Sequence, residues 1–268
     1  MEIIKMQRLM MLLLLLGAMF SSCKKEANVE ADYTRPVVQA YLVPGLPLRM
    51  KVYYQKYLED TISYGYPMKG LQPTVSDGIT TVRLLETADG VYEYADAGFV
   101  QDHKTYTLNF SYLDKVISAQ TTVPDAPVGF TASAVSQEVP AFSFGTTPAT
   151  FVPVTFSWSN PGAAAHFLMR FRNTTDDPVR TDSRNDAAYA DTEVLLGTAV
   201  TYQTQQMTFR FLGDYQVLLY HINQEYSDAI SSSGGTSLNL TNPSTNIVNG
   251  LGIFTAMKAD SLSLHVYQ

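Results

Sequence analysis

Residues 105–112 read TYTLNFSY, a stretch in which large aromatic or aliphatic residues alternate with small polar ones. One side of an extended chain would carry the four large residues, Tyr106, Leu108, Phe110 and Tyr112. A period of two is typical of a β-strand that buries one face. The stretch therefore predicts a strand with an apolar face against a core.

Comparable alternation recurs at residues 49–54, 152–159 and 261–266, and each run has the length of an ordinary strand. Turn-forming sequences such as Ser76-Asp77-Gly78 and Ala88-Asp89-Gly90 lie between the runs. This spacing of short strands and turns is typical of antiparallel β-proteins.

Helical periodicity is scarce and is clearest at residues 223–231, where Tyr226 and Ile230 stand four positions apart. The chain has 17 Tyr, and aromatic residues make up 12% of it. Both values favour strands, which are rich in aromatic residues. We expect a mainly β protein with one short helix in its second half.

The 268 residues are 46% apolar and carry a formal net charge of −7. Such a chain can fill a core, which excludes a disordered or fibrous protein. The acidic balance and the lack of a basic block argue against nucleic acid as a partner.

The amino terminus resembles a secretory signal. Lys5 and Arg8 are followed by the uninterrupted apolar run Leu9–Leu16, which is shorter than the roughly 20 residues of a membrane-spanning helix. Cys23, the single cysteine of the chain, cannot form an internal disulfide.

The tetrapeptide Phe20-Ser21-Ser22-Cys23 resembles a bacterial lipobox. The resemblance implies that residues 1–22 are a lipoprotein signal peptide and that Cys23 carries the lipid. Residues 23–35 are then a polar, lipidated tether. No later apolar run approaches the length of a span, so we expect the lipid to be the sole anchor.

The stretch Val123-Pro124-Asp125-Ala126-Pro127 indicates an extended joint, because proline cannot donate to a strand ladder. About six predicted strands precede it and about seven follow. We therefore predict two immunoglobulin/fibronectin-III-like β-sandwich domains, at residues 36–124 and 125–268.

Three segments carry a family resemblance. The sequences around Gly90-Val91-Tyr92, Tyr106 and Thr121-Thr122-Val123-Pro124 resemble β-sandwich modules of Bacteroidetes surface lipoproteins, and residues 154–158 are similar to the Trp-bearing strand of fibronectin-III modules. Residues 243–254, from Pro243 through Asn246-Ile247 to Phe254, resemble the closing segment of the DUF4249 lipoproteins. The two glycines of that segment predict a turn or bulge before the last strand.

The resemblance to DUF4249 implies a fold and a cellular location but no activity, because the function of that family is unknown. It implies a lipoprotein of the Gram-negative outer membrane that acts beside a TonB-dependent receptor. The side of the membrane, the ligand and the oligomeric state are left open by the sequence.

Motifs of catalysis are absent from the sequence: it has no H-E-x-x-H, G-x-S-x-G, P-loop or C-x-x-C. The histidines His103, His166, His221 and His265 lack metal-ligand spacing. We therefore expect a non-enzymatic protein without cofactor or metal.

Acidic residues crowd residues 173–193, namely Asp176, Asp177, Asp182, Asp186, Asp191 and Glu193, and three arginines are interleaved with or flank them, Arg172, Arg180 and Arg184. The spacing matches no calcium loop, so a solvated connection is expected, with calcium as the alternative. Two short sequences, Asp60-Thr61-Ile62 and Asp260-Ser261-Leu262, resemble O-glycosylation sequons.

A group of tyrosines surrounds a predicted connection in the first domain: Tyr53, Tyr54, Tyr57, Tyr64 and Tyr66. Exposed tyrosines stack on sugars and form the centres of protein interfaces. The alternative is that they cover both faces of a hairpin. We predict here the surface for a partner or ligand, with a TonB-dependent receptor as the first candidate and a glycan-binding or adhesin role as the alternative.

Overall fold

The structure is a computed structural model that describes residues 34–55, 65–141, 150–160, 164–182, 191–233 and 244–268. Residues Arg35–Gln268 form one compact unit. Across the described ranges, no helix combines the length and the apolar character needed to cross a bilayer.

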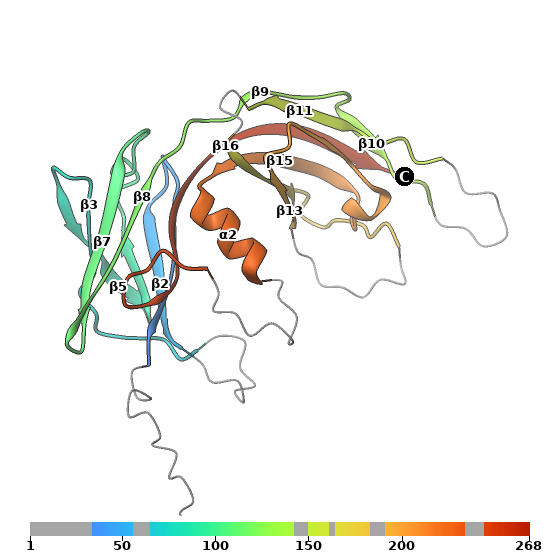
Figure 1. Ribbon diagram of the computed structural model, residues 1–268. Helices are drawn as coiled ribbons and strands as arrows, with labels where there is room; N and C mark the ends of the chain where they lie inside the picture. The colour runs from blue at the N-terminus through green and yellow to red at the C-terminus, as the bar shows by residue number, and fades with distance from the viewer. Residues whose placement is uncertain (1–33, 56–64, 142–149, 161–163, 183–190, 234–243) are drawn as a thin grey trace, which may run out of the picture. The chain divides into compact units, whose positions relative to one another are not determined.

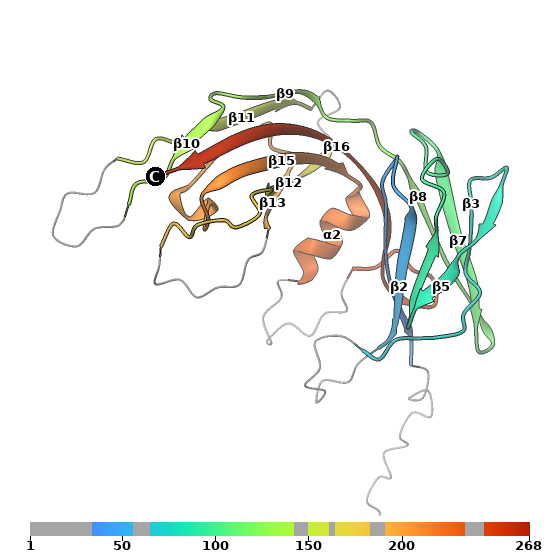
Figure 2. The same ribbon diagram turned by 180° about the vertical axis from the view of Figure 1, so that it is seen from behind.

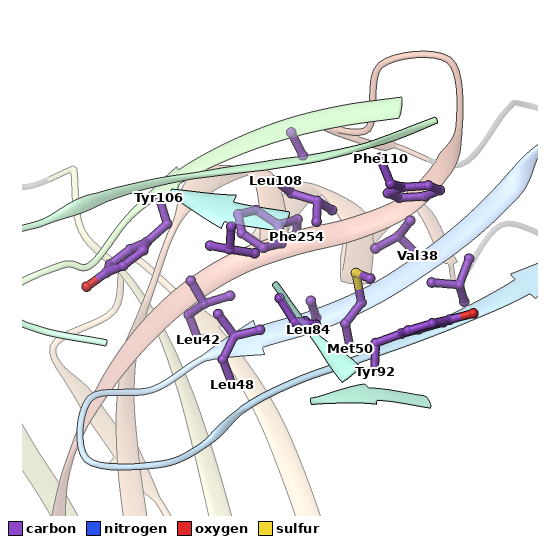
Figure 3. Close-up of a cluster of buried hydrophobic side chains, with 14 of the residues drawn as sticks. Val38, Leu42, Leu48, Met50, Leu84, Tyr92, Tyr106, Leu108, Phe110 and Phe254 are labelled. Carbon is purple, nitrogen blue, oxygen red and sulfur yellow. The ribbon is translucent and has the colours of Figure 1, made fainter. Parts of the chain in front are cut away.

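The first half of this unit is a pair of facing sheets (Figure 1). One layer contains β1 (Pro36–Leu42), β2 (Leu48–Tyr54), β6 (Val91–Tyr94) and β5 (Leu85–Ala88). The other contains β4 (Thr81–Arg83), β3 (Thr74–Ser76), β7 (Thr105–Tyr112) and β8 (Lys115–Thr122). Figure 3 shows Val38, Met50 and Leu108 meeting in the core between them. The strand predicted at 105–112 is confirmed as β7.

The second half repeats this arrangement around its own core. One layer contains β13 (Thr192–Gly197), β12 (His166–Asn173) and β15 (Gly213–Ile222), and the other contains β14 (Thr201–Gln203), β11 (Thr155–Ser159) and β9 (Val128–Ala132). Trp158 of β11 packs edge-on against Phe130 and Phe167 in this core. The prediction of a mainly β, sandwich-like fold is confirmed.

One long strand, β16 (Leu251–Tyr267), belongs to both halves. Its residues 251–256 pair in parallel with β1, and its residues 257–266 pair antiparallel with β15. The result is a nine-stranded sheet in the order β13-β12-β15-β16-β1-β2-β6-β5, with the short β10 (Ser136–Glu138) beside the end of β16. This sheet forms one layer of each sandwich.

The two cores receive different parts of β16. Phe254 is fully buried in the first core, whereas Leu264 lies in the second. The start of β16 therefore returns the chain to the sandwich built from β1–β8. The predicted boundary between residues 124 and 125 stays a prediction.

The segment before β16 has a structural role. The side chain of Asn246 brackets Phe254, donating from Nδ2 to its carbonyl oxygen at 2.7 Å and accepting from its N–H at 3.1 Å. Gly252 has a φ of +94°, and a Cβ there would lie 2.0 Å from the carbonyl oxygen of Val38. Only glycine permits β1 and β16 to approach so closely, and this explains the second glycine of the closing segment.

The helix predicted at residues 223–231 is confirmed as α2 (Gln224–Ser233). Its Tyr226 and Ile230 pack against a small apolar cluster that includes Leu168 and Met257. Figure 2 shows α2 on one side of the sheet strands β15 and β16, with β9 and β11 on the other. A single 3₁₀ turn, η1 (Gln206–Thr208), precedes β15.

Candidate functional site

A cleft of about 740 Å³ opens on the nine-stranded sheet, on the face turned away from both cores. Alternation along each strand creates it. In β1, Val38 and Ala40 enter the first core while Gln39 and Tyr41 line the cleft. In β12, by the same rule, Met169 enters the second core while Arg170 lines the cleft.

The floor of the cleft is apolar and aromatic. It is formed where β16 passes from one sandwich to the other, by Val43, Leu46, Leu168, Tyr220, Tyr226 and Met257. Leu46 is 55% exposed and Tyr41 is 40% exposed, so the cleft presents apolar surface to solvent. Such a surface favours a ligand that has an apolar or ring-shaped part.

Tyr41 and Tyr226 form the aromatic centre of the cleft, with ring centroids 5.3 Å apart in an edge-on arrangement. Burial raises the pKa of the Tyr226 phenol, and the neighbouring Tyr41 adds to that shift. Burial also raises the pKa of Tyr220. Both phenols are therefore neutral near pH 7; Tyr226 shares a side-chain hydrogen bond with Tyr41, and Tyr220 can donate to a ligand.

Two walls that carry charged side chains flank the floor. On the β2 wall, Arg49 and Lys51 point outward, and Glu93 of β6 lies across from Arg49 in the strand register. Among the residues that the structure describes, neither Arg49 nor Lys51 has an ion-pair partner. The β2 wall therefore carries a net positive charge.

The opposite wall, on β12 and β13, carries a salt-bridged group of charges. Arg170 donates to Asp191 Oδ2 from Nε at 2.8 Å and from Nη2 at 2.5 Å. Glu193 lies 3.7 Å from the same guanidinium. The cleft thus combines an apolar floor, a positive wall on β2 and a second wall whose guanidinium is already paired with carboxylates.

The amino end of α2 is tied to the strands beneath it, and this fixes Tyr226 in the cleft. Asn223 Nδ2 donates to Thr121 Oγ1 at 2.9 Å and to the carbonyl oxygen of Thr122 at 2.8 Å. The carboxylate of Glu225 accepts from the hydroxyls of Thr121 at 3.0 Å and of Thr255 at 3.3 Å. These bonds join the helix to β8 and β16, in the region where both sandwiches meet.

The tyrosines predicted as a partner surface do not form the cleft. Tyr53 shares the outward face of β2 with Arg49 and Lys51 but is not among the cleft residues. Tyr54 and Tyr66 are neighbours, since the N–H of Tyr54 donates to the carbonyl oxygen of Tyr66 at 2.8 Å. Tyr57 and Tyr64 lie outside the described residues, as does Cys23.

In the part of the acidic segment 173–193 that the structure describes, the charged side chains make separate contacts. Asp191 pairs with Arg170 in the cleft wall, and Arg180 lies over the ring of Phe211 at 5.7 Å. Within the described ranges, no group of three His, Cys, Asp or Glu side chains converges as a metal site. Arg184 and Asp186 lie outside those ranges, as does the sequence Asp60-Thr61-Ile62.

Three of the four histidines make polar contacts, and two of the three contact the same residue, Asp125. His103 Nε2 lies 2.5 Å from Asp125 Oδ1, and His265 Nδ1 lies 2.7 Å from Asp214 Oδ1. His221 Nδ1 contacts the carbonyl oxygen of Asp125 at 2.8 Å. His103 and His221 thus meet at Asp125, whereas His265 contacts the neighbouring strand β15.

Sequence reasoning missed the cleft because most of its residues occupy outward positions of strands, and the others lie in the turn between β1 and β2 or on α2. Arg49 and Lys51, for example, have the pattern of ordinary solvent-facing residues. The one local signal was Tyr226, which repeats with Ile230 on the apolar side of the predicted helix. That signal indicated that the helix packs with one apolar side, but it did not indicate which strands Tyr226 contacts.

Comparison with known proteins gives a match to a protein family. Residues 24–263 match the family model described as a domain of unknown function, DUF4249. No curated protein matches.

Among solved structures, the FN1–FN3 domains of chicken CNTN1 are 11% identical with a TM-score of 0.28, over 71% of this chain and 61% of that one. Trypsin-activated alpha-2-macroglobulin from Escherichia coli is 10% identical with a TM-score of 0.23, over 72% of this chain and 15% of that one. The chain thus spans less than two thirds of either protein.

Proposed function

Since the chain belongs to the DUF4249 family, a domain of unknown function, we propose that it is a non-enzymatic lipoprotein of the cell envelope that binds a ligand or partner in the cleft. The observation that carries the proposal is the cleft itself. Its volume of about 740 Å³ lies within the range of ligand sites, roughly 300–1,000 Å³. Its apolar floor with a few charged groups at the rim is also the usual composition of such sites.

The cleft residues support binding rather than catalysis. Tyr220 and Tyr226 are neutral near pH 7, and Arg170 is held by carboxylates. Arg49 and Lys51 are positioned to pair with an anionic group of a ligand, and Glu193 to pair with a cationic one. Charged groups on the walls set the orientation of a bound ligand, and the apolar floor supplies affinity.

The proposed anchor is a lipid on Cys23 in the outer membrane. The support is the sequence alone: the apolar run Leu9–Leu16 and the lipobox-like Phe20-Ser21-Ser22-Cys23. The proposed partner is a TonB-dependent receptor, beside which the protein acts as an accessory, ligand-binding component.

Affinity capture from the native envelope tests this function. The tagged protein is captured in its natural form and as Cys23→Ala. We expect both forms to recover a TonB-dependent receptor, because the folded body makes the contact, and we expect only the natural form to bind vesicles that contain no receptor. Capture without a receptor contradicts the accessory role, and a Cys23→Ala protein that binds such vesicles as well as the natural form contradicts the anchor.

A glycan is the second candidate ligand, favoured by the three tyrosines of the cleft, Tyr41, Tyr220 and Tyr226. Aromatic rings stack on sugar faces, and neutral phenols donate to sugar hydroxyls. A glycan array tests it with Tyr41→Ala and, as a matched control, Tyr267→Ala, which is 42% exposed and lies outside the cleft. Binding lost only in Tyr41→Ala supports a glycan ligand, and an array without binding excludes the glycans tested.

A further inference from the structure

Exposed apolar side chains gather at the end of the first sandwich where the chain enters β1. We call them the amino-end patch: Tyr54 at 37% exposure, Tyr66 at 71%, Leu113 at 68%, Val116 at 56% and Val248 at 56%. Isolated exposed apolar residues are common on proteins, but a contiguous group indicates a contact surface.

Two contacts through neighbouring residues place the members of the patch at the same end of the first sandwich. The ring of Tyr54 lies 6.4 Å from that of Tyr112, at the end of β7 and next to Leu113. Asn249 Nδ2 donates to the carbonyl oxygen of Val116 at 2.9 Å, which holds Val248 beside β8.

The patch lies beside the point where the chain enters the fold. Tyr54 is the register partner of Pro36, the first residue of β1. The N–H of Gln55 donates to the carbonyl oxygen of Arg35 at 3.1 Å. Figure 2 shows the turn between β7 and β8 at the same end of the sandwich as the start of β1.

Cys23 is twelve residues upstream of Arg35. A fully extended chain of that length reaches at most about 43 Å. If Cys23 is lipidated, as the proposed function holds, this end of the body stays within reach of the bilayer surface. The second sandwich joins the first through β16, so it has no such constraint of its own.

The chemistry of the patch fits a lipid surface. Leucine and valine side chains enter the boundary of the acyl chains, and tyrosine rings prefer the headgroup region, where one end is apolar and the other is wet. We propose that the amino-end patch rests on the lipid bilayer and orients the body, with the lipid on Cys23 supplying the attachment.

Fluorescence quenching tests this orientation on the lipidated full chain. A tryptophan is introduced by Val116→Trp in the patch and, as a matched control, by Val128→Trp in β9, where the valine is 57% exposed. Both proteins are reconstituted into vesicles of phosphatidylethanolamine and phosphatidylglycerol with brominated acyl chains. Both proteins also carry Trp158→Phe, because Val128 pairs with Ser159 next to the native Trp158, so that only the added tryptophan emits.

We expect at least a threefold loss of the added emission for Val116→Trp and no loss for Val128→Trp. Hydrogen exchange provides a second measurement without substitution in the patch: amides 112–117 exchange more slowly in the lipidated protein on vesicles than in Cys23→Ala in solution. If neither tryptophan is quenched, or both are quenched alike, on protein that sediments with the vesicles, the proposed orientation is wrong. If the protein does not sediment, the lipid anchor has failed instead.

Discussion

Gly252 shows how one residue sets the junction of the two sandwiches. Its φ of +94° and the 2.0 Å approach of a Cβ to the carbonyl oxygen of Val38 together exclude a side chain. Gly45 is a useful contrast, because it also has a positive φ, of +83°, but a Cβ there meets nothing within 4 Å.

We predict that Gly252→Ala lowers the free energy of unfolding by at least about 3 kcal/mol, since it combines backbone strain with a clash inside a buried strand pair. Gly45→Ala carries the strain alone and is expected to cost about 1 kcal/mol. Urea unfolding of both variants measures the difference. Equal losses would contradict the close approach of β1 and β16.

Asp77 holds the turn between β3 and β4. Its carboxylate accepts from Lys104 Nζ at 2.8 Å and from the backbone N–H groups of Thr80 and Ile79. The bond from Lys104, followed by these two N–H groups, lowers the pKa of Asp77 to about 2.

Because the pKa of Asp77 is lower in the folded state, the ionised carboxylate stabilises the fold above its ordinary pKa of 3.8. That stabilisation is lost as the pH falls from about 4 towards 2. We predict that the urea midpoints of the natural protein and of Asp77→Asn differ at pH 5 and converge near pH 2. Lys104→Gln should remove the largest part of the same pH dependence. A gap between midpoints that is constant with pH would refute the assignment.

The elements that alternate in sequence were predictable. The run at residues 105–112 became β7 with the same bounds, and 49–54 lies within β2. The first half of β16 was not predictable, because residues 253–257 are buried without alternation. Strand residues that are covered on both faces show no period of two, so the sequence concealed the strand that joins the sandwiches.

Helix α2 was predictable as a helix but not as part of the floor of the cleft. Its position depends on Asn223, whose side chain reaches Thr121 and Thr122, about one hundred residues earlier in the chain. A contact of this range leaves no local signal in the sequence. The candidate site was therefore hidden even though its helix was correctly expected.

We predict that Asn223→Ala loosens α2 selectively. Removing the amide takes away two hydrogen bonds, and a net loss of about 1.4 kcal/mol corresponds to a tenfold faster exchange of the amides of residues 224–233. The amides of β15 and β16 should keep their rates. Gln224→Ala is the control, because within the described ranges the side chain of Gln224 bonds only to the exposed Asp228 of the same helix. Faster exchange throughout both sandwiches would argue against a local anchor.

At the scale of the molecule, the shared strand couples the two cores. Unfolding of the first core removes the partner of residues 251–256, and unfolding of the second removes the partner of residues 257–266. We predict a single calorimetric transition for the natural chain, with van't Hoff and calorimetric enthalpies that agree. Two separate transitions would show that the predicted domains at 36–124 and 125–268 unfold independently.

The central claim is that the cleft between the charged walls binds the partner. The most direct measurement is quantitative capture of the TonB-dependent receptor by Arg49→Gln/Lys51→Gln and by the matched pair Arg83→Gln/Arg210→Gln, which removes the same charge from exposed sites outside the cleft. The account predicts at least tenfold less receptor with the first pair and an unchanged amount with the second. Receptor recovered in full by the Arg49→Gln/Lys51→Gln protein, or lost equally from both pairs, would contradict it.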